Sequence, residues 1–202
     1  MEDLKTKSDA ALLRLALARD EDAFRALYDR LKRGIFRYAF YMTNSRSAAE
    51  EVTQEVFVTL LKKGHGYDSS LGDVGAFTFG LARNVVRRVE RRERINRALF
   101  PEDAGQESLS APEALTTNLL REERVALVRA AIARLPDHYR QAVVLCDLCE
   151  LSYAEAAGKL DCSVGTVRSR LSRGRELLAQ KLKVTTDVGA TVRNAGAEGC
   201  LT

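Results

Sequence analysis

Apolar residues recur along most of this chain at intervals of three or four positions, which is the spacing of one face of an α-helix. One such face, within residues 27–43, consists of Leu27, Leu31, Ile35, Tyr38 and Met42. A second, within residues 47–63, consists of Val52, Val56 and Leu60. No stretch alternates apolar and polar residues for long enough to predict a β-strand. The pattern therefore predicts an all-α protein.

The helical pattern is interrupted once, between Leu99 and Asn118. This stretch holds two of the three prolines and four carboxylates but no basic residue, a composition typical of a flexible acidic linker. We therefore expect two small helical domains, the first over residues 1–98 and the second over residues 120–184, joined by a linker at residues 99–119. The remaining residues, 185–202, are predicted to form a disordered tail.

The second domain contains the pattern of two helices joined by a tight turn. Ser152 and Glu155 have the spacing of a capping box, which predicts a short helix from about Tyr153 to Leu160. Ser163 is a natural N-cap for a longer helix, and the three residues 161–163 leave room only for an angled turn. We expect this part of the chain to be a helix-turn-helix.

The longer helix would place Val167 and Leu171 toward the core. Its other face carries hydroxyl and guanidinium groups, at Thr166, Arg168, Ser169, Ser172 and Arg173. In a helix-turn-helix the second helix enters the major groove of DNA, where such groups can contact base edges and phosphates. The alternative for a basic helix face is contact with solvent alone.

Two further polar surfaces are predicted in the first domain. Opposite the valine stripe of residues 47–63 lie Glu50, Glu51, Gln54 and Glu55, a face that could dock a basic helix of a partner or simply contact solvent. In the following helix, Arg83, Arg87 and Arg91 form one ridge, and Arg88 and Arg92 form a neighbouring one. Because aligned arginines repel one another, this helix is expected to face phosphates. Phe77 and Phe79, close to Asn84, could stack on unpaired bases, although Phe77 could equally belong to the core.

Charge is distributed very unevenly. The whole chain carries a net charge of +4, whereas residues 83–97 and residues 168–183 each carry +5, so the rest of the chain is acidic at −6. Two separate basic segments on an acidic body predict two polyanion-binding surfaces.

Other kinds of site have weaker support. Cys146 and Cys149 are three residues apart, and Cys162 follows, but a zinc site would need a fourth ligand such as His138. Metal binding and thiol sensing remain alternatives to the simpler role of small buried apolar residues. No phosphate-binding glycine loop and no His-Glu-x-x-His motif is present, and His65 and His138 are the only histidines. We therefore expect no metal, no cofactor and no enzymatic activity.

No apolar run approaches the roughly 20 residues that span a bilayer, and the N-terminus lacks the apolar core of a secretory signal. The expectation is a cytoplasmic protein without membrane insertion.

Three segments, in this order, resemble those of extracytoplasmic-function (group IV) sigma factors of the sigma-70 family of bacterial RNA polymerase. They are AEEVTQEVF at residues 49–57, LARN at residues 81–84, and the segment from LPDHYR to SRGRELL at residues 135–178. The resemblance implies a subunit that directs promoter recognition, DNA melting and transcription initiation. It implies as partners core RNA polymerase, through its clamp helices and flap, promoter DNA, and an anti-sigma factor as a candidate regulator.

The resemblance also implies roles for individual residues. Polymerase binding falls to Glu50, Glu51, Gln54, Glu55 and Phe57. Recognition and melting of the minus-ten element falls to Tyr67, Asp68, Asp73, Phe77, Arg83, Asn84, Arg87, Arg88 and Arg91. Recognition of the minus-thirty-five element falls to Thr166, Arg168, Ser169, Ser172 and Arg173.

The chain departs from the family pattern at four places. Phe77-Thr78 stands where Trp-Leu is usual, Gly80 replaces a longer side chain, Asp161 replaces a turn glycine, and Gly174 lies within the predicted recognition helix. A glycine there should cost about 1 kcal/mol relative to alanine. The alternative function is a dimeric helix-turn-helix regulator that binds DNA without polymerase, but such a protein has no need of the arginine-rich helix with its LARN segment.

Overall fold

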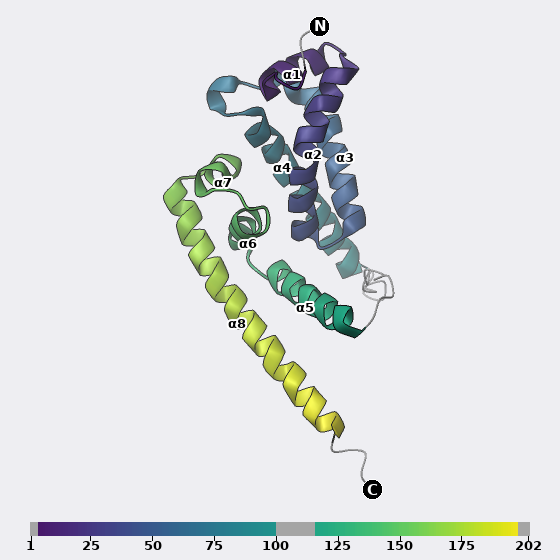
Figure 1. The fold of residues 1–202 in the computed structure, drawn as a ribbon, viewed down its shortest axis with the longest axis vertical. Helices are drawn as coiled ribbons and strands as arrows, with labels where there is room; N and C mark the ends of the chain where they lie inside the picture. Colours follow the sequence, from purple (N-terminus) through teal and green to yellow (C-terminus); the bar gives the residue numbers. More distant parts are fainter. Residues whose placement is uncertain (1–3, 100–115, 198–202) are drawn as a thin grey trace.

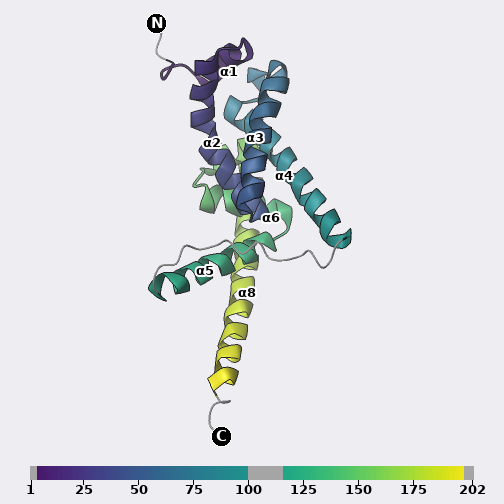
Figure 2. The same ribbon diagram turned by 90° about the vertical axis from the view of Figure 1, so that its right-hand side faces the viewer.

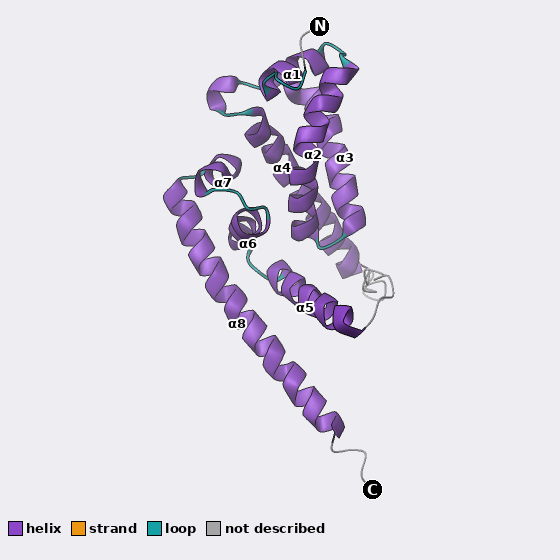
Figure 3. Ribbon diagram, viewed as in Figure 1, coloured by secondary structure: helices purple, strands orange, loops and turns teal. Residues whose placement is uncertain are grey.

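The computed structural model describes residues 4–99 and 116–197. Within these ranges every regular element is a helix or a helical turn and no strand occurs, as Figure 3 shows. The prediction of an all-α protein is confirmed.

The first domain is built from four helices, three of which run side by side while the shortest lies across one end (Figure 1). They are α1 (Asp9–Leu17), α2 (Glu21–Thr43), α3 (Arg46–Lys63) and α4 (Val74–Leu99), and two 3₁₀ turns, η1 (Gly64–Gly66) and η2 (Ser69–Leu71), connect α3 to α4. Ser8, Asp20 and Ser45 begin the first three helices, and the side chain of each accepts a backbone N–H three residues later. Each cap satisfies a donor that the first helical turn leaves unpaired.

The core of the first domain contains the apolar faces that the sequence predicts. The fully buried side chains on α2 and α3 include Leu27, Tyr38, Met42, Val52, Val56 and Leu60, while Leu31 is only half-buried. Val74, Ala82, Val86 and Val89 of α4 close the same core. Burial of this apolar surface is the main stabilising contribution to the domain.

The second domain comprises α5 (Thr116–Ala133), α6 (Asp137–Val143), a π-helical turn η4 (Val144–Leu148), α7 (Tyr153–Leu160) and α8 (Val164–Ala197). The helix-turn-helix is present with the predicted bounds. Two predicted boundaries differ: α5 begins inside the predicted linker, and α8 continues into the predicted tail. Extending a formed helix needs no new nucleation, so propagation can continue through residues of modest helix propensity. The rest of the linker, 100–115, and residues 198–202 lie outside the described residues.

Gly174 lies where α8 crosses α6. A Cβ at this position would come within 2.8 Å of Val143 Cγ2 and 3.2 Å of the Tyr139 carbonyl oxygen. The glycine is therefore explained by the close approach of two helices, which the sequence pattern alone does not reveal.

The two domains pack against each other. α7 contacts α4, while α5 and η4 contact α2. Figure 1 places α6 and α7 beside the first domain, and Figure 2 also places α6 there. One cluster of buried apolar residues runs across both domains and includes Phe79 of α4 with Leu145 and Leu160. The domains are thus in a closed arrangement, in which one face of α4 lies against the helix-turn-helix.

Candidate nucleic-acid and partner interfaces

The turn of the helix-turn-helix is held by local hydrogen bonds. The Ser152 hydroxyl accepts the Glu155 N–H at 3.2 Å, and the Glu155 carboxylate accepts the Ser152 N–H at 2.8 Å. Hydrogen bonds from Ser152 also lower the pKa of Glu155. Asp161 ends α7 with a left-handed backbone at φ 52°, a conformation that aspartate tolerates better than most residues. Ser163 then begins α8 by accepting the Thr166 N–H at 3.1 Å.

The first turns of α8 separate an apolar face from a polar one. Val167 and Leu171 are buried, whereas Arg168, Ser169, Ser172 and Arg173 are exposed and Thr166 is half-buried. The Arg168 guanidinium lies 5.8 Å from the centre of the Tyr153 ring. These side chains form a surface from which hydroxyls and guanidiniums can reach a DNA groove.

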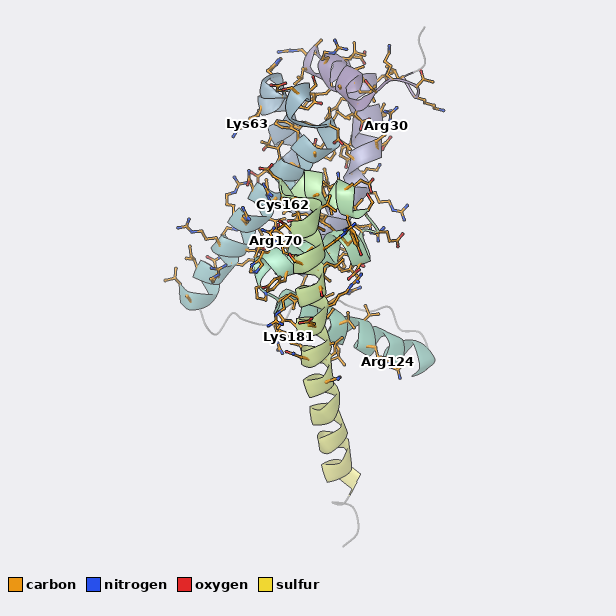
Figure 4. All side chains as sticks on the ribbon, turned by 90° about the vertical axis from the view of Figure 1, so that its left-hand side faces the viewer. Arg30, Lys63, Arg124, Cys162, Arg170 and Lys181 are labelled. Atoms are coloured by element: carbon orange, nitrogen blue, oxygen red, sulfur yellow. The ribbon has the colours of Figure 1, made fainter. Side chains whose placement is uncertain are left out.

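Other basic residues of α8 have partners within the second domain. Arg175 forms two hydrogen bonds to the Asp147 carboxylate, at 2.6 and 3.1 Å, and Arg170 is half-buried near Cys162. Figure 4 shows Cys162 and Arg170 close together at the start of α8 and Lys181 further along it. Asp147 was absent from the predicted site because it lies 28 residues from Arg175 in sequence.

A partly exposed aromatic pair lies at the start of α4. The rings of Tyr67 and Phe77 have centroids 5.6 Å apart, and the Tyr67 hydroxyl donates to the Gly72 carbonyl at 2.9 Å. Both side chains are half-buried, while Asp68 and Asp73 are exposed beside them. Asp73 accepts the Ala76 N–H at 2.6 Å and so begins α4. The structure therefore brings these four predicted residues together where the loop enters α4, and the Phe77 side chain is half-buried at the edge of the core.

The arginine ridge of α4, Arg83, Arg87 and Arg91, faces the second domain. Arg83 donates to the Leu160 carbonyl at 3.0 Å, and Arg87 lies 3.6 Å from the Asp137 carboxylate. Arg91 and Asn84 are exposed. In the closed arrangement, two of the three ridge arginines are therefore occupied by contacts with the helix-turn-helix domain.

The neighbouring arginines of α4 turn the other way, toward α3. Arg92 forms a bidentate pair with Glu51, with both N–O distances 3.0 Å, and Arg88 pairs with Glu55. We call these two contacts the α3–α4 charge pairs. The hydrogen bond from Arg92 lowers the pKa of Glu51. The predicted DNA-binding residue Arg88 and the predicted polymerase-binding residue Glu55 thus contact each other.

The other predicted polymerase-binding residues differ in accessibility. Glu50 and Gln54 are exposed, and Glu50 accepts from Arg46 of the same helix at 3.1 Å. Phe57, in contrast, is 3% exposed, with its ring 4.6 Å from that of Tyr28. In the chain without a partner the Phe57 ring belongs to the core and supports α3 from inside, and its role in polymerase binding stays a prediction.

A buried ion pair between the domains was not predicted. Arg140 of α6 donates to the Glu90 carboxylate at 2.6 Å and to the Met42 carbonyl at 3.0 Å. The Arg140 and Glu90 side chains are only 11% and 17% exposed. Burial raises the pKa of Glu90, although Arg140 opposes that shift. Glu90 and Arg140 are 50 residues apart, so no local sequence pattern indicates this contact.

The described residues include three cysteines, Cys146, Cys149 and Cys162, and each is half-buried. Among the described residues, no group of three or more histidine, cysteine or acidic side chains is arranged to hold a metal ion. Burial raises the pKa of the Cys149 thiol to about 11 and also raises that of Cys146. Thiols that resist ionisation are poor nucleophiles, which favours a packing role for both residues.

Within the described ranges, none of the helices combines the length and the apolar character that a bilayer crossing requires.

Two family models match the chain. One, described as Sigma-70 region 2, matches residues 27–95, and the other, described as Sigma-70, region 4, matches residues 126–178. The first covers α2 to α4 with the loop before α4, and the second covers the helix-turn-helix and the helices before it.

Named relatives match over most of the chain. The ECF RNA polymerase sigma-E factor of Escherichia coli K12 is 34% identical over 145 residues, which cover 66% of this chain and 73% of that protein. The ECF RNA polymerase sigma factor SigW of Bacillus subtilis is 29% identical, with 81% and 91% of the two chains covered. SigE of Mycolicibacterium smegmatis, also called an ECF RNA polymerase sigma factor, is 34% identical over 73% of this chain, which spans only 57% of that relative.

Solved structures share the fold. CnrH, solved in complex with the cytosolic domain of CnrY, superposes with a TM-score of 0.64 at 22% identity, and the match covers 88% of this chain and 99% of CnrH. The sigma factor RpoE from Bartonella quintana, solved with the anti-sigma factor NepR, superposes with a TM-score of 0.57 at 22% identity, covering 80% and 97% of the two chains.

Proposed function

Because the chain belongs to the extracytoplasmic-function sigma factors of the sigma-70 family, we propose that its two domains divide promoter recognition between them. The first domain binds core RNA polymerase through α3 and opens the minus-ten element along α4. The second reads the minus-thirty-five element as duplex through α8. The observation that carries this proposal is the exposed polar face at the start of α8. It lies on a helix-turn-helix whose apolar face is buried and whose two helices both have side-chain N-caps.

The loop before α4 is suited to hold an unpaired base. Tyr67 and Phe77 provide aromatic surface at the edge of the fold, and Asp68 and Asp73 provide hydrogen-bond acceptors beside it. Unstacking a base costs a few kcal/mol, and a pocket that stacks and hydrogen-bonds the extruded base offsets part of that cost. We assign capture of a flipped base of the minus-ten element to this loop.

The closed arrangement has to open for this function. Arg83 and Arg87 contact the second domain, so these side chains reach DNA only after α7 and α6 have moved away from α4. The linker permits this movement, since the sixteen residues between α4 and α5 would span up to roughly 53 Å if extended. The two basic surfaces can then occupy separate elements of one promoter.

We further propose that the chain acts in the cytoplasm, carries out no catalysis of its own, and is controlled by an anti-sigma factor. The complex of the sigma factor RpoE with the anti-sigma factor NepR supports the last point by fold similarity. An anti-sigma factor that binds both domains would favour the closed arrangement, in which Arg83 and Arg87 contact the second domain and cannot reach DNA.

The experiment that tests the proposal is transcription from a promoter library by core RNA polymerase, with and without this protein. We expect the chain to select a defined set of start sites with polymerase and to bind duplex promoter DNA only weakly alone. Tight, sequence-specific footprints from the isolated protein would instead support a dimeric regulator.

Docking to polymerase has its own test. Reversing the charge of Glu50, Glu51 and Glu55 to lysine should weaken the affinity for core polymerase, with the helical circular-dichroism signal retained. An unchanged affinity in this triple variant would remove the docking role of α3.

A further inference from the structure

The α3–α4 charge pairs connect two surfaces to which different partners are assigned. Glu51 and Glu55 are one helical turn apart on α3, and Arg92 and Arg88 are one turn apart on α4, so the contacts form two matched rungs. The carboxylates belong to the polymerase-docking face. The guanidiniums belong to the helix that faces DNA. Each side chain is therefore already engaged by a residue of the other surface.

Geometry makes these contacts competitive with both partners. Glu51 accepts both of its hydrogen bonds from the fork of Arg92, each at 3.0 Å. The fork uses two of the five guanidinium donors and one acceptor site on each carboxylate oxygen, and it neutralises both charges, so an external cation or phosphate gains less from either group while the pair is intact. A basic helix docking on α3 therefore gains the full charge of the carboxylates only by displacing Arg92 and Arg88, and a phosphate docking on α4 gains that of the guanidiniums only by displacing Glu51 and Glu55.

All four side chains remain accessible for such an exchange. Their exposed fractions lie between 35% for Glu55 and 62% for Arg88. Pairs of this kind contribute little net stability, so exchanging partners does not unfold the domain. Opening the two domains would not release these arginines, because Glu51 and Glu55 belong to the same domain as α4.

We propose that the α3–α4 charge pairs couple polymerase binding to DNA binding. When a basic helix of core polymerase forms ion pairs with Glu51 and Glu55, Arg92 and Arg88 are released and can bind DNA phosphates. By linkage, DNA that binds the two arginines frees the carboxylates to bind polymerase, so each partner raises the affinity of the chain for the other. This inference rests on the proposed function and adds to it a positive coupling between its two surfaces.

The first test measures DNA binding by the full-length protein without polymerase, using a fluorescently labelled single-stranded oligonucleotide in a salt series. Glu51→Gln releases Arg92 and should tighten binding by about two- to five-fold at low salt, as expected for one surface ion pair. The salt dependence should steepen by about 0.7, the increment for one added phosphate contact on a single strand.

Glu50→Gln is the matched control. It removes the same charge from the same helix, but its partner is Arg46 of α3 and not an arginine of α4. Glu50→Gln should raise the affinity for the oligonucleotide only by the smaller amount that follows from losing any one negative charge. In an Arg92→Ala background, Glu51→Gln should give no more than this smaller gain. Equal effects of Glu51→Gln and Glu50→Gln in the wild-type background would overturn the proposal.

The second test measures the affinity of full-length variants for core RNA polymerase without DNA. Arg92→Ala leaves Glu51 unpaired and should tighten polymerase binding by about two- to five-fold. Arg91→Ala removes an equal charge one residue away, on the ridge that faces the second domain, and should have a smaller effect. No difference between Arg92→Ala and Arg91→Ala would contradict the coupling.

These outcomes separate the inference from the proposed function. If Glu51→Gln weakens polymerase binding but neither test shows the expected differences, α3 docks polymerase and the coupling is absent. If Glu51→Gln leaves polymerase binding unchanged, the docking surface itself is wrong and the coupling falls with it.

Discussion

At the scale of single residues, Arg168 is the side chain whose position most directly suggests base reading. It lies on the exposed side of α8, with its guanidinium over the Tyr153 ring. Replacing Arg168 with alanine should cost about 1 to 3 kcal/mol on the preferred minus-thirty-five sequence and much less on a scrambled one. Holoenzyme binding to both promoters, measured across a salt series, checks this prediction.

Lys181 provides the comparison for Arg168. It lies three turns further along α8 (Figure 4), where a cation would contact the DNA backbone. Lys181→Ala should weaken holoenzyme binding to both promoters equally. The salt dependence of binding should fall by at most the increment of about one phosphate contact. If Arg168→Ala also weakened binding to the preferred and the scrambled promoter equally, α8 would contact phosphates only and would not read bases.

Burial of Cys149 predicts low thiol reactivity. With its pKa raised from 9.0 to about 11, only about one molecule in a thousand carries the thiolate at pH 8. Alkylation of Cys149 by iodoacetamide, followed by mass spectrometry, should therefore be slow at pH 8 and much faster in the denatured chain. Because the pKa is raised in the folded state, the buried neutral thiol contributes to the free energy of unfolding. This contribution is fully present below pH 9 and is lost as the pH rises toward 11. Rapid modification of the native protein at pH 7 would restore thiol sensing as a function.

At the scale of helices, the crossing of α6 and α8 depends on Gly174. The alanine Cβ would lie 2.8 Å from Val143 Cγ2 and 3.2 Å from a backbone oxygen that cannot rotate away. Gly174→Ala should therefore lower the free energy of unfolding by about 1 to 3 kcal/mol, although alanine is the better helix former. Denaturant unfolding measures the change.

Gly158 is the matched control for Gly174. It lies within α7 with no atom within 4 Å of an added Cβ, so Gly158→Ala should raise stability by about 0.5 to 1 kcal/mol. If Gly174→Ala were also stabilising, α6 would have room to shift and the close approach would not explain the glycine.

Most of these elements follow from local pattern. Ser152 with Glu155, and Ser163 before the next helix, predict the helix-turn-helix because a cap involves residues only three apart. The start of α5 at Thr116 and the end of α8 at Ala197 could not be placed in this way. Three successive residues, 116–118, are of types that can cap a helix, and no proline follows α8 to mark its end. Gly174 appears unfavourable in one helix, and its reason lies in another helix that no local pattern brings near.

At the scale of the whole molecule, Arg140 links the two domains. Removing it leaves the buried Glu90 carboxylate and the Met42 carbonyl without their donor. Arg140→Ala should cost about 3 kcal/mol, as for other broken buried pairs, and should increase the radius of gyration in small-angle X-ray scattering as closed molecules open. Arg46→Ala removes an exposed pair within α3 and should change neither quantity. An unchanged radius in Arg140→Ala would show that apolar packing alone holds the domains together.

The candidate site was predictable where its residues lie on one helix, and less so where they contact residues of another helix. The polar face of α8 follows from helical periodicity alone. The partners of the α4 arginines do not, because Glu51 is 41 residues from Arg92 and Leu160 is 77 residues from Arg83. Aligned arginines were expected to face phosphates, but in the closed arrangement Arg87, Arg88 and Arg92 pair with carboxylates and Arg83 donates to a carbonyl.

The contacts of Arg83 and Arg87 with the second domain have a kinetic consequence. A DNA strand can reach these side chains only in the fraction of molecules that is open, so the apparent affinity of the free chain is its intrinsic affinity multiplied by that fraction. Each 1.4 kcal/mol by which the closed state is favoured lowers the apparent affinity about tenfold. With rising DNA concentration, the observed association rate should level off at the rate of domain opening. If core polymerase holds the domains apart, as the proposed function requires, this plateau should disappear in its presence.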